Sequence, residues 1–131
     1  MAVIRTPLGR ARGLGSAKHG VGHFIAQRVT AAALVVLVLW SITGVLQLAR
    51  GDYDDAVNWL RSPVNAGLAI LLAIAAFWHM QLGMRVIIED YIAKPTTKAA
   101  LLILNVFVCW GAAAITILSL LKVALGAGTV I

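Results

Sequence analysis

The sequence predicts an all-α membrane protein with three transmembrane helices. Of its 131 residues, 61% are hydrophobic and only 12% are charged, and the mean hydropathy is +0.93. An ordinary soluble domain carries about twice that share of charged residues. Three apolar segments reach the length of about 20 residues that a helix needs to cross a bilayer. The rest of the chain is too short for a soluble catalytic domain, so any enzymatic role must be shared with other subunits.

The chain divides into an N-terminal tail (residues 1–23), a transmembrane region (24–125) and a C-terminal tail (126–131). The apolar segments that we expect to span the membrane are residues 24–49, 64–92 and 99–125. Five glycines lie among the basic residues of the N-terminal tail, and they favour an extended tail without regular structure.

The basic residues predict the orientation of the spans. Eight of the eleven lie in the N-terminal tail, at the start of the first span or around the second connection, and three lie elsewhere. Lys and Arg are retained on the cytoplasmic side, so the N-terminus should be cytoplasmic and the C-terminus outside. The tail lacks the apolar core of a cleavable signal peptide, and we expect a multi-pass protein of a bacterial inner membrane rather than a mitochondrial one. Basic residues scattered along a tail tethered to lipid do not indicate nucleic acid binding.

The connections also carry local signals. Asp52, Asp54 and Asp55 precede apolar residues at helical spacing, which predicts a short helix on the outer interface with Tyr53 and Trp59 at headgroup level. The second connection is short, so the second and third spans should form an antiparallel hairpin. Pro95 breaks the helical ladder, and we expect Thr96 or Thr97 to cap the third span. In the first span, Gly44 permits close approach of a neighbouring helix, and Trp40 is a packing or interface residue.

The most informative stretch runs from Trp78 to Tyr91. His79 lies near the middle of an apolar span, where a polar side chain is costly and usually functional. At 3.6 residues per turn, His79, Gly83, Val86 and Asp90 share one face of the helix. The imidazole has three possible roles: a structural hydrogen bond to another helix, a proton relay, or a metal ligand, most plausibly of haem iron. Gly83 would let a flat porphyrin lie against the helix.

Other polar residues also have two interpretations. Asp90 and Tyr91 end the span, either as an interfacial aromatic residue beside a solvated acid or as donors to a quinone carbonyl. Arg28 either extends to the headgroups or faces a buried anion such as a haem propionate or a quinone oxygen. We expect His19 and His23 to be histidines of the cytoplasmic surface near the headgroups, with a role near a buried site as the alternative, and neither has an assigned role. A haem held between two histidines would therefore need its second one from another subunit.

These residues resemble a known family. The stretch H-M-Q-L-G-M-R-V-I-I-E-D-Y, the R-V-T-A at the head of the first span and the three-span layout resemble the hydrophobic membrane anchor subunit of succinate dehydrogenase (the D-type, haem-binding anchor of respiratory complex II). The resemblance covers most of the chain from about Ser16 onward.

The resemblance implies that His79 is one axial ligand of haem b and that the sister cytochrome b anchor subunit supplies the other. It implies that Arg28 lies near the haem propionates and the quinone pocket, and that Tyr91, with Asp90 behind it, binds ubiquinone. It further implies partners, an iron–sulfur subunit and a flavoprotein subunit, that oxidise succinate while this chain anchors them without catalysing the reaction. The alternative is a small proton-coupled transporter or pore-forming homo-oligomer in which His79 relays protons.

Overall fold

A computed structural model describes residues 6–12 and 20–126. The described residues form five helices and no strands: α1 (Pro7–Arg12), α2 (Gly20–Leu48), α3 (Tyr53–Arg61), α4 (Pro63–Tyr91) and α5 (Pro95–Ala124). Helices α2, α4 and α5 are long and apolar enough to cross a membrane, as predicted. Each begins before the start of the expected span, by four residues for α2, by one for α4 and by four for α5.

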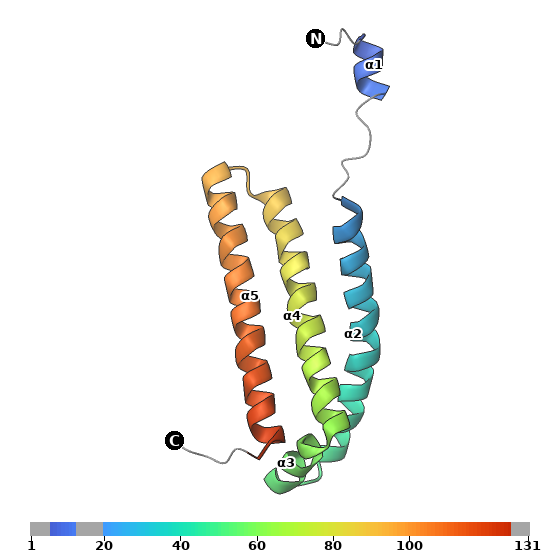
Figure 1. Ribbon diagram of the computed structural model, residues 1–131, viewed down its shortest axis with the longest axis vertical. Coiled ribbons are helices and arrows are strands. Elements are labelled where there is room, and N and C mark those ends of the chain that lie inside the picture. Colours follow the sequence, from blue (N-terminus) through green and yellow to red (C-terminus); the bar gives the residue numbers. More distant parts are fainter. Residues whose placement is uncertain (1–5, 13–19, 127–131) are drawn as a thin grey trace.

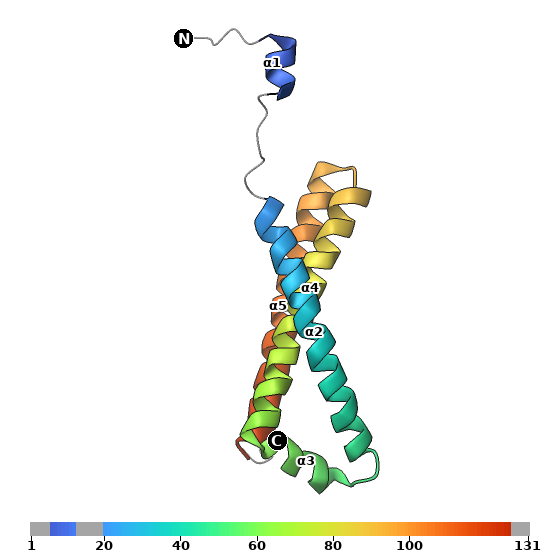
Figure 2. The same cartoon turned by 90° about the vertical axis from the view of Figure 1, so that its right-hand side faces the viewer.

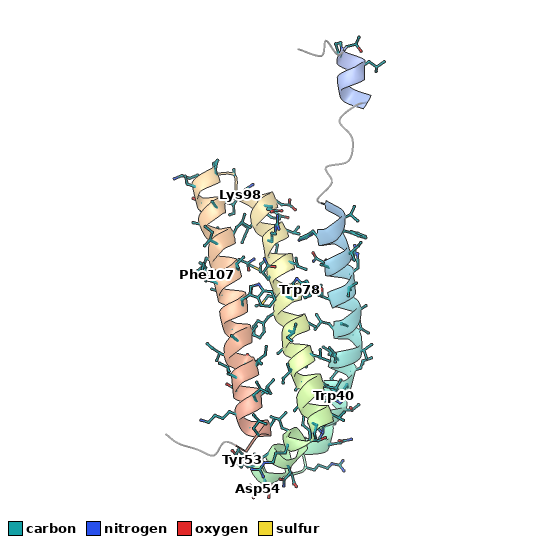
Figure 3. All side chains as sticks on the ribbon, in the orientation of Figure 1. Trp40, Tyr53, Asp54, Trp78, Lys98 and Phe107 are labelled. Carbon is teal, nitrogen blue, oxygen red and sulfur yellow. The ribbon has the colours of Figure 1, made fainter. Side chains whose placement is uncertain are left out.

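The three long helices form a bundle in which α4 is the middle element. Helices α4 and α5 lie side by side along their whole length, whereas α2 crosses α4 and diverges from it towards the end where α3 bridges the two (Figures 1 and 2). The α4–α5 connection lies at one end of the bundle, near Lys98, while Tyr53 and Asp54 of α3 lie at the other (Figure 3). The spans thus alternate in direction, as the sequence predicts.

Helix α3 is the short helix expected between the first two spans. Asp52 caps its N-terminus: the carboxylate accepts from Asp55 N at 3.0 Å, and the Asp55 carboxylate accepts from Asp52 N at 3.1 Å. This reciprocal pair satisfies two backbone donors and explains why the helix forms here. Tyr53 is exposed, whereas the Trp59 ring is half-buried and packs against Trp40.

Trp59 joins α3 to the diverging part of α2. Its ring stacks on Trp40 with centroids 5.3 Å apart, and a Cβ added at Gly44 would lie 2.8 Å from the Trp59 ring. Gly44 thus allows a close approach, as predicted, but the neighbour is a side chain of α3 rather than another span. On the other side, Asn65 of α4 donates to the Trp59 carbonyl at 2.9 Å. Trp59 therefore links α2 and α4 where their backbones separate.

Two local expectations are wrong. Residues 7–12 form helix α1, although the glycines favoured an extended tail: Pro7 occupies the first helical position, and the Thr6 hydroxyl accepts from Gly9 N at 3.1 Å. Helix α5 begins at Pro95 rather than at a threonine cap, because the first helical position has no need of the N–H that proline lacks. The rest of the N-terminal tail, including His19, lies outside the described residues.

Small residues dominate the interior. The described apolar residues exposed by less than a tenth are Ala66, Ala73, Ala75, Leu82, Ile88, Cys109 and Ala113. A lipid-embedded bundle gains no hydrophobic energy by hiding large side chains from lipid, so its helices pack through small residues that permit close contact. Asn105 adds a polar contact between α4 and α5, since its side-chain amide donates to the Gln81 carbonyl at 2.9 Å. The Cys109 thiol in turn donates to the Asn105 side-chain oxygen at 3.3 Å.

Candidate functional site

His79 contacts a single polar side chain from the neighbouring span. Its Nδ1 lies 3.0 Å from Oγ1 of Thr30 on α2, and Thr30 is 4% exposed. In the described part of the chain no hydrogen bond reaches the other ring nitrogen, Nε2. A neutral imidazole with one nitrogen held by a neighbour and the other unoccupied is the usual arrangement of a histidine that binds a metal.

The side of α4 that carries His79 also carries Gly83 against α2. A Cβ added at Gly83 would lie 3.9 Å from Nε2 of Gln27, an ordinary van der Waals distance, so no contact within residues 6–12 and 20–126 requires a glycine there. Thr30 and Gln27 are nearly one turn apart on α2, as His79 and Gly83 are on α4. The two helices therefore meet along one short polar seam, which we call the α2–α4 seam (Gln27, Thr30, His79 and Gly83).

An open apolar hollow adjoins this seam. It has a volume of about 430 Å³, and its lining consists of Ala31, Leu34, Val35, Val38, Leu39 and His79. The imidazole is thus the one lining side chain with a metal-binding atom. A lining of aliphatic side chains with one imidazole is chemically suited to a porphyrin, which needs apolar walls and a ligand for its iron.

Among the described residues, neither Arg28 nor the end of α4 forms a hydrogen bond with His79. The Arg28 side chain is exposed, and its guanidinium lies 5.0 Å from the centre of the Phe24 ring on its own helix. Asp90 and Tyr91 are exposed in the last turn of α4, Tyr91 by 80%. Twelve residues of helix separate Tyr91 from His79, about 18 Å along the axis. The chain therefore presents two separate places for chemistry, one inside the bundle and one at its end.

The charges beside Asp90 are already paired. Arg85 Nε donates to Glu89 Oε1 at 2.7 Å, and Lys98 Nζ donates to the Glu89 backbone carbonyl at 2.8 Å. Among the described residues Asp90 takes part in no ion pair. Its carboxylate and the Tyr91 phenol therefore remain available to a group from outside this chain.

His23 differs from the surface histidine that we expected. Its ring is half-buried, and its Nε2 is buried with no hydrogen-bond partner in the described part of the chain. It lies one turn before Gln27 on α2. No three His, Cys, Asp or Glu side chains among the described residues lie close enough together to hold a metal ion.

Thr30 is the site residue that the sequence reading missed. Threonine in an apolar helix usually bonds to a carbonyl of its own helix, and Thr30 does so as well, which makes it inconspicuous. The available signal was its spacing: His23, Gln27 and Thr30 recur at intervals of four and three residues, which places three polar side chains on one face of an otherwise apolar span.

Comparison with known proteins identifies the family of the chain. Residues 3–119 match the family model described as succinate dehydrogenase/fumarate reductase transmembrane subunit. A succinate dehydrogenase hydrophobic membrane anchor subunit from Rickettsia bellii is 34% identical over 100 residues, which cover 76% of this chain and 80% of the relative. The subunit of the same name from Paracoccus denitrificans is 33% identical over 122 residues, covering 93% and 94%. No solved structure matches the chain. This multi-pass membrane protein therefore belongs to the family of succinate dehydrogenase and fumarate reductase transmembrane subunits.

Proposed function

We propose that this chain is the hydrophobic membrane anchor subunit of a succinate:quinone oxidoreductase, and that it holds one side of a haem b and part of the ubiquinone site. The observation that carries the proposal is the contact between Thr30 and His79, which occupies Nδ1 of a histidine that also lines an apolar hollow. The names of the relatives support the anchor role. They also disfavour a self-assembling proton transporter.

His79 would bind the haem iron through Nε2, and Gly83 would keep that face of α4 clear. When bound, haem supplies a one-electron redox centre whose potential depends on its axial ligands and on the low dielectric around it. The second axial ligand would come from a sister cytochrome b anchor subunit. Arg28 is exposed on α2, two residues before Thr30, and it would pair with an acidic group of the cofactor or of the partner subunit.

Tyr91 and Asp90 would form this chain's part of the quinone site. A phenol donates a hydrogen bond to a quinone carbonyl, and a nearby carboxylate can accept or pass on a proton. Both side chains are exposed at the end of α4, where an iron–sulfur subunit and the sister anchor can complete the pocket. A soluble flavoprotein subunit, not embedded in the membrane, would oxidise succinate. The complex would lie in a bacterial inner membrane with the α4–α5 connection facing the cytoplasm.

The test is the haem of the purified complex with His79→Ala. We expect the haem content to fall and any remaining haem to lose its low-spin visible and electron paramagnetic resonance signature, because one of two axial nitrogens is gone. His23→Ala is the matched control, because it also deletes a histidine, but one on the neighbouring helix α2. This variant should keep the low-spin signature. A wild-type complex without a b-type spectrum, or an unchanged spectrum in His79→Ala, would overturn the haem assignment.

A further inference from the structure

The hydroxyl of Thr30 lies within hydrogen-bonding distance of three atoms. Its Oγ1 lies 2.8 Å from the Ala26 carbonyl oxygen, 3.2 Å from the Gln27 carbonyl oxygen and 3.0 Å from Nδ1 of His79. A hydroxyl has one proton to donate and two lone pairs with which to accept. Carbonyl oxygens only accept, so the Thr30 proton must point towards the carbonyls of its own helix. The hydroxyl oxygen then faces His79 with a lone pair.

This geometry determines which nitrogen of His79 carries the proton. If Thr30 donated to Nδ1 instead, two oxygen–oxygen contacts of 2.8 Å and 3.2 Å would lack a proton between them. Nδ1 must therefore donate to Thr30, and in a neutral imidazole the lone pair then lies on Nε2. The chain of bonds from Nδ1–H through the hydroxyl to the carbonyl polarises each member and strengthens the acceptor.

We propose that Thr30 is the positioning residue of the haem ligand: it fixes His79 in the Nδ1–H tautomer, orients the ring and increases the electron donation of Nε2 to iron. The inference rests on the proposed function, since it concerns what Nε2 binds. Thr30 suits the task in an apolar span because it is neutral and has no need of water. Its hydroxyl is also anchored to the helix that carries it, so the acceptor occupies a fixed position.

Three variants of the complex test the role of the hydroxyl. Thr30→Val keeps the shape of the side chain and removes the acceptor, whereas Thr30→Ser keeps the acceptor. Thr43→Val is the matched control: Thr43 lies on the same helix, its hydroxyl donates to the Trp40 carbonyl at 2.7 Å, and it is exposed. The measurements are haem content, the low-spin spectrum and the haem midpoint potential.

In Thr30→Val we expect haem to be bound at least about tenfold more weakly, as when the outer partner of other metal-binding histidines is removed. The midpoint potential of the remaining haem should become more positive, because a less electron-rich imidazole stabilises the ferric state less. Thr30→Ser and Thr43→Val should match the wild type. A Thr30→Val complex that matches the wild type, or a Thr30→Ser complex that shows the same change as Thr30→Val, would overturn the proposal.

The tautomer has a separate readout. Nitrogen-15 NMR of the histidine-labelled complex after removal of haem distinguishes a proton on Nδ1 from one on Nε2. The haem is removed because iron on Nε2 would by itself leave the proton on Nδ1. We expect the His79 signal to show Nδ1 protonated, and a proton on Nε2 would overturn the proposal on its own. Failure of the proposed function has a different signature, the absence of haem from the wild type or an unchanged spectrum in His79→Ala.

Discussion

Helix α4 packs against two neighbours in different ways. Towards α5 it forms a closed hairpin with buried alanines and one amide contact, between Asn105 and the Gln81 carbonyl. Towards α2 it meets the polar α2–α4 seam, and α2 diverges from α4 towards α3 (Figure 2). An open hollow adjoins this seam. The hairpin is complete within this chain, whereas the seam and the hollow expose atoms that can bind something else. We infer that stability resides mainly in the hairpin and function in the seam and at the free end of α4.

This division follows from the solvent. In lipid, helices associate through close packing and a few hydrogen bonds, so a contact made for stability uses small residues and leaves little space. A binding site in the same bundle needs the opposite: space, and a polar atom that remains unpaired. Helix α4 accommodates both kinds of contact because one face packs against α5 and another against α2. Where α2 separates from α4, Trp59 of α3 contacts both helices.

The largest expected effect is at the free end of α4. In Tyr91→Phe, succinate oxidation with an artificial electron acceptor should be unchanged, whereas ubiquinone reduction should fall by about a hundredfold, because the phenol that donates to the quinone carbonyl is lost. Both rates are measured on the purified complex. Tyr53→Phe is the matched control, since Tyr53 is 79% exposed, as Tyr91 is 80%, and lies at the other end of the bundle.

Two results would contradict the role of Tyr91. If both activities fell together, the change would act on assembly or on the soluble subunits. If neither fell, the phenol would have no part in quinone reduction, and the exposed end of α4 would serve only as an interface.

The hairpin should respond in the opposite way, with a loss of stability and no change in chemistry. Ala113 of α5 and Ala73 of α4 are both buried, Ala113 being 2% exposed. Asn105 of α5 contacts Gln81 of α4, and each alanine lies the same number of residues from its end of this contact. Because the two helices are antiparallel, the two alanines are about level. Ala113→Leu forces a larger side chain into this contact and should cost about 1–3 kcal/mol. We expect a lower melting temperature of the detergent-solubilised complex, with unchanged turnover per assembled complex.

Ala114→Leu is the control for this prediction, because Ala114 is the next residue on α5 and is exposed in this chain. It should leave the melting temperature close to that of the wild type. A stable Ala113→Leu complex with altered haem would contradict the division between the hairpin and the seam.

The sequence predicted what depends on local pattern. The three long helices follow from apolar length, and α3 follows from acidic residues placed to cap it, so both were predicted without knowledge of tertiary contacts. His79 and Gly83 were expected on one face because helical spacing alone determines it, and both lie against α2. Helix α1 was missed because the glycines outweighed the local capping by Thr6 and Pro7.

What the sequence did not predict are the partners across helices. The contact between Thr30 and His79 joins residues 49 positions apart, and it depends on the angle at which α2 crosses α4. The packing of Trp59 against Trp40 likewise depends on the divergence of α2, which helical periodicity does not encode. The roles assigned to Arg28, Asp90 and Tyr91 involve groups supplied by other chains, so they remain predictions.

The smallest expected effect is the loss of the amide contact in the hairpin. Asn105→Leu removes the bond to the Gln81 carbonyl and the acceptor of the Cys109 thiol. The carbonyl lies inside α4 and keeps its helical partner, and a thiol is a weak donor, so neither group loses a strong bond. The cost should be about 0.6 kcal/mol, the average for such bonds in a membrane protein. The melting temperature should fall less than in Ala113→Leu, and Ser119→Ala, which removes a hydroxyl bonded to its own helix, should change it less still. If Asn105→Leu proved as damaging as Ala113→Leu, hydrogen bonding rather than close packing would hold the hairpin together.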